Sequence, residues 1–305
     1  MDADETLAFE ARRRPRAAAA ALGAALLILA GYLVAGAAFA DRPSAGLLPA
    51  LERAVQPGPV AAGQSLQVPA LEFYSGRVAP LIAGAALRGL GFLLVGLALT
   101  YLAAATRARS ESFPRFAQYL PLIGGVLSAI SFVLAPIGSA IGVNAFLDGP
   151  RTVAAAEDIQ REPIIVAAQF IGLPGTLALA LAFVLVSLNA MRAGLLTRFM
   201  GVLGILAGAL FILPLGSELP VVQCFWLGAL GILFLGRWPG GAPAAWRTGR
   251  AEPWPSQQEL REARTRAKVG GPRTAPEPVA AVPGNGTTGA DPAPAERKRK
   301  RKRRT

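Results

Sequence analysis

The sequence predicts an all-α integral membrane protein, a six-helix transmembrane bundle followed by a mostly disordered basic tail. Charged residues make up only 16% of the 305 residues, and the mean hydropathy is +0.43. A soluble domain carries about 25% charged residues. The uncharged residues gather in six apolar blocks, each long enough for a helix to cross ~30 Å of hydrocarbon. Arginines are denser in every second loop between the blocks, which is typical of a multi-pass membrane protein.

The six blocks set the predicted spans and the domain boundaries. A cytoplasmic basic arm at residues 1–16 precedes a transmembrane domain at 17–236, and a cytoplasmic tail at 237–305 follows it. The spans are expected at residues 17–40, 81–105, 119–143, 164–188, 199–215 and 220–236. The first block ends in Ala38-Phe39-Ala40, which is similar to a signal-peptidase site, so cleavage there is the alternative. We expect it to remain a helix, because it is longer than the apolar core of about 7–15 residues in a signal peptide.

The arginine pattern predicts that both termini lie in the cytoplasm. Several arginines crowd the N-terminal arm, Arg107, Arg109 and Arg115 follow the second span, and Arg192 and Arg198 follow the fourth. Because short cytoplasmic loops carry an excess of Lys and Arg, this set marks the cytoplasmic side. The high Ala, Gly and Arg content is typical of a GC-rich bacterial genome, so the expected location is a bacterial plasma (inner) membrane.

Several classes of chemistry lack their usual residues. The chain has no histidine and one cysteine, Cys224, so the sequence predicts no metal site, no cofactor and no catalytic residues. The predicted spans also have no Asp or Glu in their interiors. Proton-coupled transporters need a group at depth that changes charge, so this absence argues against that class.

Arg88 is the ionisable residue that the loop pattern does not place. It lies in the second span, and a guanidinium there either snorkels towards the membrane surface or binds an anionic ligand or a buried partner. Gln169 in the fourth span and Gln223 in the sixth are candidate hydrogen-bond partners. These three residues form the candidate ligand site, with interhelical hydrogen bonding as the alternative role of the glutamines.

Small residues recur at a spacing of four within the spans. Gly138 and Gly142 form one such pair in the third span, and Gly204 and Gly208 form another in the fifth. This spacing places both glycines on one helix face, where two backbones can approach closely. We expect the pairs to pack helices within one chain, with packing between two copies in a homo-oligomer as the alternative.

The tail carries about half of the 31 Lys and Arg residues. Ser256 and Glu259 have the form of a capping box, which predicts a short helix near residues 256–268. The chain ends in a basic octet, Arg297, Lys298, Arg299, Lys300, Arg301, Lys302, Arg303 and Arg304. Each cation is worth ~1 kcal/mol near an anionic cytoplasmic leaflet. The expected partners are therefore the lipid bilayer and its anionic head groups, and the alternatives are a ribosome, a nucleic acid or a cytoplasmic protein.

The segment from Arg192 to Gly204 resembles one found in uncharacterised bacterial multi-pass membrane proteins of unknown function. In those proteins a short Arg-x-Gly-Leu-Leu-x-Arg turn joins two helices, and a glycine-rich run opens the second helix. The resemblance covers about 30 residues. It implies a topology, with a turn at Gly194, and it implies no activity.

The sequence favours a non-enzymatic function. The leading interpretation is a membrane structural or accessory protein whose basic tail engages anionic lipid or a cytoplasmic partner. The alternative is a small-solute transporter or channel with Arg88 in its pathway. An intramembrane enzyme is the second alternative, and the missing acid–base residues argue most strongly against it.

Overall fold

The computed structural model describes residues 2–43, 51, 64–212, 220–254, 261–262 and 265. These residues form helices and no strands, so the predicted all-α fold is confirmed. The chain divides into two units, Met1–Trp254 and Pro255–Thr305. Helices α1 to α10 all belong to the first unit.

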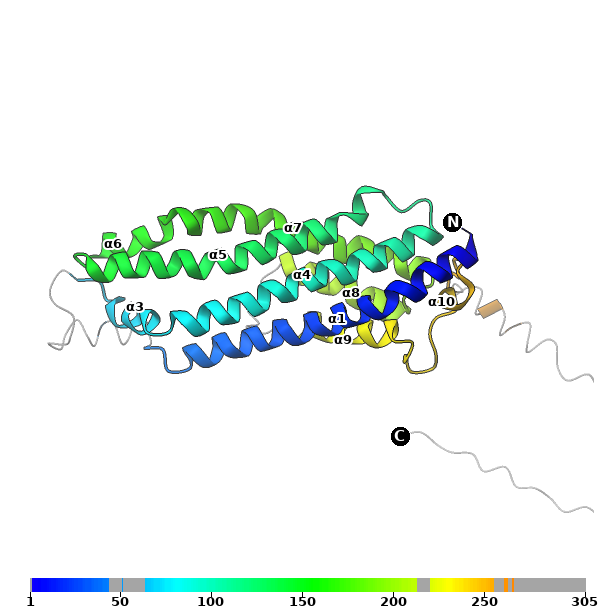
Figure 1. Ribbon diagram of the computed structural model, residues 1–305, viewed down its shortest axis with the longest axis horizontal. Helices are drawn as coiled ribbons and strands as arrows, with labels where there is room; N and C mark the ends of the chain where they lie inside the picture. The colour runs from blue at the N-terminus through cyan, green and yellow to red at the C-terminus, as the bar shows by residue number, and fades with distance from the viewer. Residues whose placement is uncertain are drawn as a thin grey trace, which may run out of the picture. The chain divides into compact units, whose positions relative to one another are not determined.

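Four helices of the described chain are long and apolar enough to cross a membrane. They are α1 (Ala3–Phe39), α4 (Val78–Arg109), α5 (Leu120–Asp148) and α7 (Pro163–Arg192). Helix α1 packs on α4, α4 packs on α5, and α5 packs on α7, so the four form a row (Figure 1). The first four predicted spans therefore correspond to helices suited to a membrane.

Two shorter apolar helices occupy the positions of the fifth and sixth predicted spans. Helix α8 (Arg198–Ile212) has 15 residues and α9 (Val221–Phe234) has 14. At 1.5 Å per residue the described part of each is about 21–23 Å long, which is less than the ~30 Å of a hydrocarbon core. The structure thus gives four candidate spans rather than six, and residues 213–219 between α8 and α9 lie outside the described part.

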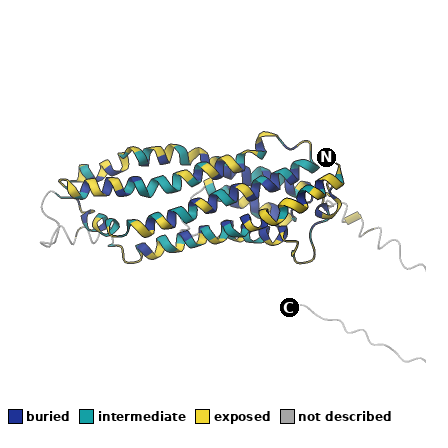
Figure 2. Cartoon of the chain, viewed as in Figure 1, coloured by how far each residue is buried: buried dark blue, intermediate teal, exposed yellow. Residues whose placement is uncertain are grey.

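Helices α8 and α9 cover only one half of the row. Gly208 of α8 faces Ala180 and Phe183 of α7, and Gly231 of α9 faces Leu22 of α1. This half contains the start of α1 and the C-terminal ends of α4 and α7. We call the end of the bundle where these helix termini lie the arginine-rich end, and the other end of the bundle the opposite end. Buried residues gather in the half that α8 and α9 cover (Figure 2), where the larger hydrophobic core lies.

Local sequence signals explain where these helices begin and end. Asp2 and Glu5 form a reciprocal capping box, in which the Glu5 amide donates to the Asp2 carboxylate at 2.8 Å. Helix α1 therefore starts at Ala3, and the predicted basic arm is its continuous first part. Helix α7 ends at Arg192, two residues before Gly194, which has a φ of 75°. The predicted turn at Gly194 is confirmed, since glycine adopts this conformation without strain.

The opposite end is held by short elements. These are α3 (Val68–Ser75), α6 (Val153–Asp158) and a 3-10 turn at Ile159–Arg161. A small hydrophobic cluster that includes Val68 and Ile159 joins them to α5 and α7. The Tyr74 hydroxyl donates to the Pro136 carbonyl at 3.3 Å, and burial raises the pKa of this phenol.

The first unit extends beyond Gly236, where the sequence predicted that the membrane domain ends. Residues 237–254, with α10 (Ala245–Thr248), pack on the arginine-rich end. The Trp254 indole donates to the Leu196 carbonyl at 2.8 Å. Of the predicted helix near 256–268, only Arg261, Glu262 and Thr265 are described, and the basic octet lies outside the described residues.

Candidate functional site at the arginine-rich end

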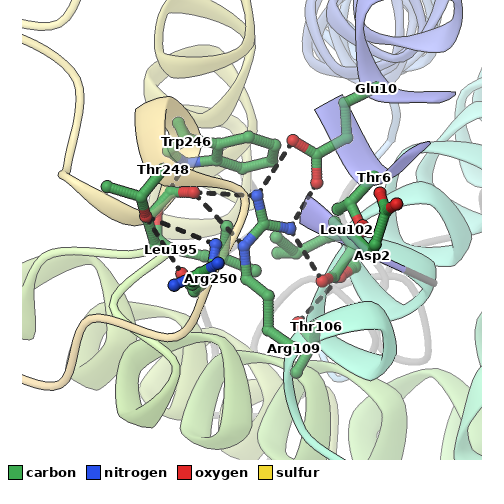
Figure 3. A network of polar contacts seen from close by, with 12 residues as sticks. Asp2, Thr6, Glu10, Leu102, Thr106, Arg109, Leu195, Trp246, Thr248 and Arg250 are labelled. Atoms are coloured by element: carbon green, nitrogen blue, oxygen red, sulfur yellow. Dashed lines mark hydrogen bonds and ion pairs between the residues drawn. The ribbon is translucent and has the colours of Figure 1, made fainter. Parts of the chain in front are cut away.

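A buried ion pair lies at the arginine-rich end, between Arg109 of α4 and Glu10 of α1 (Figure 3). The Arg109 side chain is 0% exposed and the Glu10 side chain 4%. Nη1 and Nη2 of Arg109 donate to the two carboxylate oxygens, the second bond being 3.0 Å long. The pair is thus bidentate, the strongest arrangement of these two groups.

The remaining donors of Arg109 are engaged by backbone carbonyls. Nη1 donates to Ala105 at 3.0 Å, and Nη2 and Nε donate to Ala245 at 2.8 Å and 3.3 Å. A guanidinium has five N–H groups, and all five have an acceptor here. The ion pair therefore joins α1, α4 and the segment that follows α9.

Trp246 of α10 packs over this ion pair. Its ring lies 5.5 Å from the Arg109 guanidinium carbon and 4.7 Å from that of Arg14, and its indole donates to the Leu195 carbonyl at 2.8 Å. The ring also stacks on Tyr101 of α4. Because every N–H group of Arg109 has an acceptor and Trp246 packs over the pair, this cluster joins α1, α4 and α10 and stabilises the fold.

Two polar atoms beside the ion pair have no hydrogen-bond partner among the described residues. They are Nε of Arg14 and the hydroxyl of Tyr101, and both are buried. Nη2 of Arg14 donates to the Leu233 carbonyl at 2.9 Å, so the arginine is only partly satisfied. A buried donor without an acceptor costs about 1–3 kcal/mol, which makes the Tyr101 hydroxyl an unusual feature.

Tyr101 lines a cavity of about 410 Å³ between α1 and α4. Arg13 and Arg16 lie on its α1 side, and Leu97 and Thr100 lie on its α4 side. A second, adjacent hollow is lined by Phe9, Arg12, Arg13 and Arg16. The arginine-rich end thus has a cationic rim above a mainly apolar cavity.

Arg88 lies in the half of the row that α8 and α9 do not cover. It is about 15 Å along α4 from Val78 and about 31 Å from Arg109, by helical rise. Its guanidinium carbon is 5.0 Å from the ring of Tyr32 and 5.3 Å from the ring of Phe132, and its Nε donates to the Gly84 carbonyl at 3.3 Å. The side chain is therefore held between aromatic rings of α1 and α5.

The two glutamines predicted to accompany Arg88 lie on other helices. Gln169 is exposed on α7, whereas Gln223 is buried on α9 at 7% exposure. Neither takes part in the described hydrogen bond of Arg88. The structure therefore does not assemble the three residues into one site through their described contacts.

The four predicted packing glycines lie at close contacts between elements of this chain. A Cβ at Gly138 would lie 2.9 Å from the Ile165 amide nitrogen, and one at Gly142 would lie 3.1 Å from Ile159. Gly204 faces Ser187 in the same way, and Gly208 lies against α7. These contacts lie within one chain, and they leave the prediction of a homo-oligomer untested.

Sequence analysis did not identify the ion pair or the cavity. The sequence offered one signal for a polar cluster here: Glu10 precedes Arg14 by four residues, a spacing that places both on one helix face. The pairing of Glu10 with Arg109 depends on how α1 packs against α4, which local spacing does not reveal. Among the described residues no group of His, Cys, Asp or Glu is placed to hold a metal ion.

Comparison of the chain with protein-family models, with curated proteins and with solved structures finds no match. The fold defines a helical protein with four candidate membrane spans, and the function has to be argued from its geometry.

Proposed function

We propose that the chain is a multi-pass protein of a bacterial plasma membrane, with both termini in the cytoplasm. The argument for the orientation is the position of Arg107, Arg109, Arg192 and Arg198 at one end of the row. Six apolar segments are our proposal for the topology. Helix α8 begins at the arginine-rich end and α9 ends there, so the chain enters and leaves this helix pair on the same side. The proposed orientation is therefore the same whether α8 and α9 cross the membrane fully or turn back inside it.

We propose a non-enzymatic, structural or accessory role in which the helical unit holds the basic tail at the cytoplasmic leaflet. One observation carries this proposal: the first unit ends at Trp254, whose indole is bonded to Leu196 at the arginine-rich end. The chain thus leaves the first unit, after Trp254, on the side where the arginines gather. Eight cations near an anionic leaflet would contribute roughly 1 kcal/mol each.

Vesicle recruitment tests this role. The full chain is placed in nanodiscs of neutral phosphatidylcholine and mixed with vesicles that contain phosphatidylglycerol. We expect recruitment that falls steeply with salt, because each phosphate contact releases counterions. A variant with residues 297–304 replaced by glutamine keeps the length and is expected to lose recruitment. Equal recruitment by both proteins would overturn the proposal, as would recruitment of RNA or ribosomes in place of anionic vesicles.

A further inference from the structure

We propose that the cavity between α1 and α4 is a binding site for one anionic phospholipid of the cytoplasmic leaflet. In this site Arg13 and Arg16 bind the phosphate, and one acyl chain runs along Leu97 and the ring of Tyr101. The residues involved are separate from the basic octet. The site therefore goes beyond the proposed role of the tail and does not depend on it.

No ion pair among the described residues neutralises Arg13 or Arg16 at the rim. Arg13 and Arg16 are three residues apart on α1, so they share a helix face, and both are exposed. The guanidinium carbon of Arg13 lies 4.6 Å from the Phe9 ring, and Arg16 makes no hydrogen bond or ion pair with any described residue. Glu10, the acid nearest to them along α1, is bound to Arg109. Two free cations at this spacing suit a phosphate group.

Tyr101 forms a fixed wall of the cavity. The residue is only 7% exposed and lines the cavity, and its hydroxyl is buried. Its ring is fixed by Trp246 and by Phe234, which lies edge-on at 5.1 Å. A ligand in the cavity would therefore contact the ring of Tyr101 and not its hydroxyl.

The lower part of the cavity is apolar and faces the hydrocarbon side. Ala17, Ala20 and Ala104 contribute small side chains, and Leu97 on α4 is 45% exposed. The charged residues stop at Arg16 and the apolar part of α1 begins at Ala17, which marks a membrane–water interface. A cationic rim above an apolar slot at this level matches a phospholipid, with its phosphate above and its acyl chain below. A small soluble anion would use the rim and leave the slot unfilled.

Lipid retention measured by native mass spectrometry tests the site. The full chain is purified from membranes containing phosphatidylglycerol and phosphatidylcholine, and the bound lipids are counted. We expect the Arg13→Gln/Arg16→Gln variant to retain about tenfold less phosphatidylglycerol, as befits the loss of two charge-assisted contacts. Tyr101→Phe, which keeps the ring in the cavity wall and removes only the buried hydroxyl, is expected to leave retention unchanged.

The matched control is Arg42→Gln/Arg77→Gln, which removes the same charge at the opposite end. Both of these arginines also stack on phenylalanine rings. The control and the Tyr101→Phe variant should melt like the wild type and show that the fold is intact. Unchanged retention in the Arg13→Gln/Arg16→Gln variant would overturn the site. Displacement of the lipid by inorganic phosphate alone at millimolar concentration would also overturn it, because the site would then bind a soluble anion.

Repeating the comparison with the basic octet replaced by glutamine separates this site from the tail. We expect the tenfold effect of the arginine pair to persist there. If the tail recruits no vesicles but the effect persists, the proposed role of the tail fails and the lipid site stands. If the effect disappears with the octet, the lipid was held by the tail and the site is overturned.

Discussion

Helix α4 carries two arginines in very different surroundings, Arg109 at the arginine-rich end and Arg88 in the half that α8 and α9 do not cover. Arg109 is fully buried, and all five of its N–H groups have acceptors on three parts of the chain. Arg88 is partly exposed and has one described hydrogen bond, to its own helix, and two aromatic neighbours. The same residue type thus joins three parts of the chain at one position and makes few polar contacts at the other.

The difference shows that arginines at a membrane boundary cannot be treated as equivalent charges. Arg109 belongs to the loop pattern from which the orientation is predicted, yet its charge is neutralised by Glu10 inside the fold. Arg13 and Arg16, close by, remain available to a ligand. The arginine-rich end therefore contains both a structural arginine and functional candidates, which only their contacts distinguish.

The largest expected effect comes from removing the segment that covers the ion pair. Truncation after Gly236 deletes Trp246, Trp254 and the Ala245 carbonyl, which accepts two bonds from Arg109. Loss of one buried tryptophan alone costs about 3–5 kcal/mol, so we expect the melting temperature in detergent to collapse. Truncation after Trp254 should leave it unchanged. Equal melting of the two truncations would place the domain boundary back at Gly236.

If the shorter truncation yields no folded protein, the point variant Trp246→Ala provides the measurement. It removes the ring over Arg109 and the bond to Leu195 and leaves the chain complete. We expect a loss of about 3–5 kcal/mol in the free energy of unfolding. A loss below about 1 kcal/mol would contradict the role assigned to the segment.

The next effect concerns the ion pair itself. Glu10→Ala leaves the Arg109 charge buried without its carboxylate, and breaking a buried pair in this way costs about 3–5 kcal/mol. The matched control is Glu72→Ala at the opposite end, which breaks the exposed pair with Arg151, 2.9 Å long. Exposed pairs contribute about 0–1 kcal/mol. Denaturant unfolding of both variants measures the contrast, and similar losses would refute it.

A smaller effect is expected where helices approach closely. At Gly208 a Cβ would lie 2.8 Å from the Ala180 carbonyl oxygen, whereas at Gly228 of α9 it would meet nothing within 4 Å. Gly208→Ala should therefore cost about 1–3 kcal/mol through overpacking. Gly228→Ala should be neutral or stabilise the helix by up to about 1 kcal/mol. Thermal unfolding of the pair decides, and a tolerated Gly208→Ala would show that α7 and α8 are less tightly packed.

How far the sequence predicts this molecule follows from which interactions are local. The apolar blocks, the turn at Gly194 and the close contacts at Gly138 and Gly142 follow from composition and spacing, and the structure has helices or contacts at each. Whether α8 and α9 cross the membrane does not follow, because their apolar blocks have 17 residues each, which is the lower limit for a span. The pairing of Glu10 with Arg109 joins residues 99 positions apart, so it depends on packing that no local pattern encodes.

The tail boundary illustrates the same limit. Trp246 and Trp254 stand among Pro and Gly, which is typical of a segment outside a packed domain. Their indole N–H groups nevertheless reach the carbonyls of Leu195 and Leu196, which are buried in the turn between α7 and α8. A buried backbone carbonyl needs a hydrogen-bond partner, but the sequence does not specify which distant residue supplies it.

The smallest expected effect is at Arg88. Arg88→Met keeps most of the side-chain volume and removes one hydrogen bond and the contacts of the charge with Tyr32 and Phe132. A cation–π contact at a partly exposed site is worth about 0.5–1 kcal/mol, so we expect a loss of about 1 kcal/mol. Arg109→Met should cost at least about 3 kcal/mol, because it leaves the Glu10 carboxylate buried and unpaired.

Unfolding of the two arginine variants, with and without added anion, completes the comparison. Equal losses for Arg88→Met and Arg109→Met would show that Arg88 also fastens the fold, against its described contacts. If sulfate or phosphate raised the melting temperature of the wild type but not of Arg88→Met, Arg88 would hold an anionic solute. The transport alternative would then gain its first support. We expect no anion effect that depends on Arg88, because its guanidinium faces two rings and its own helix.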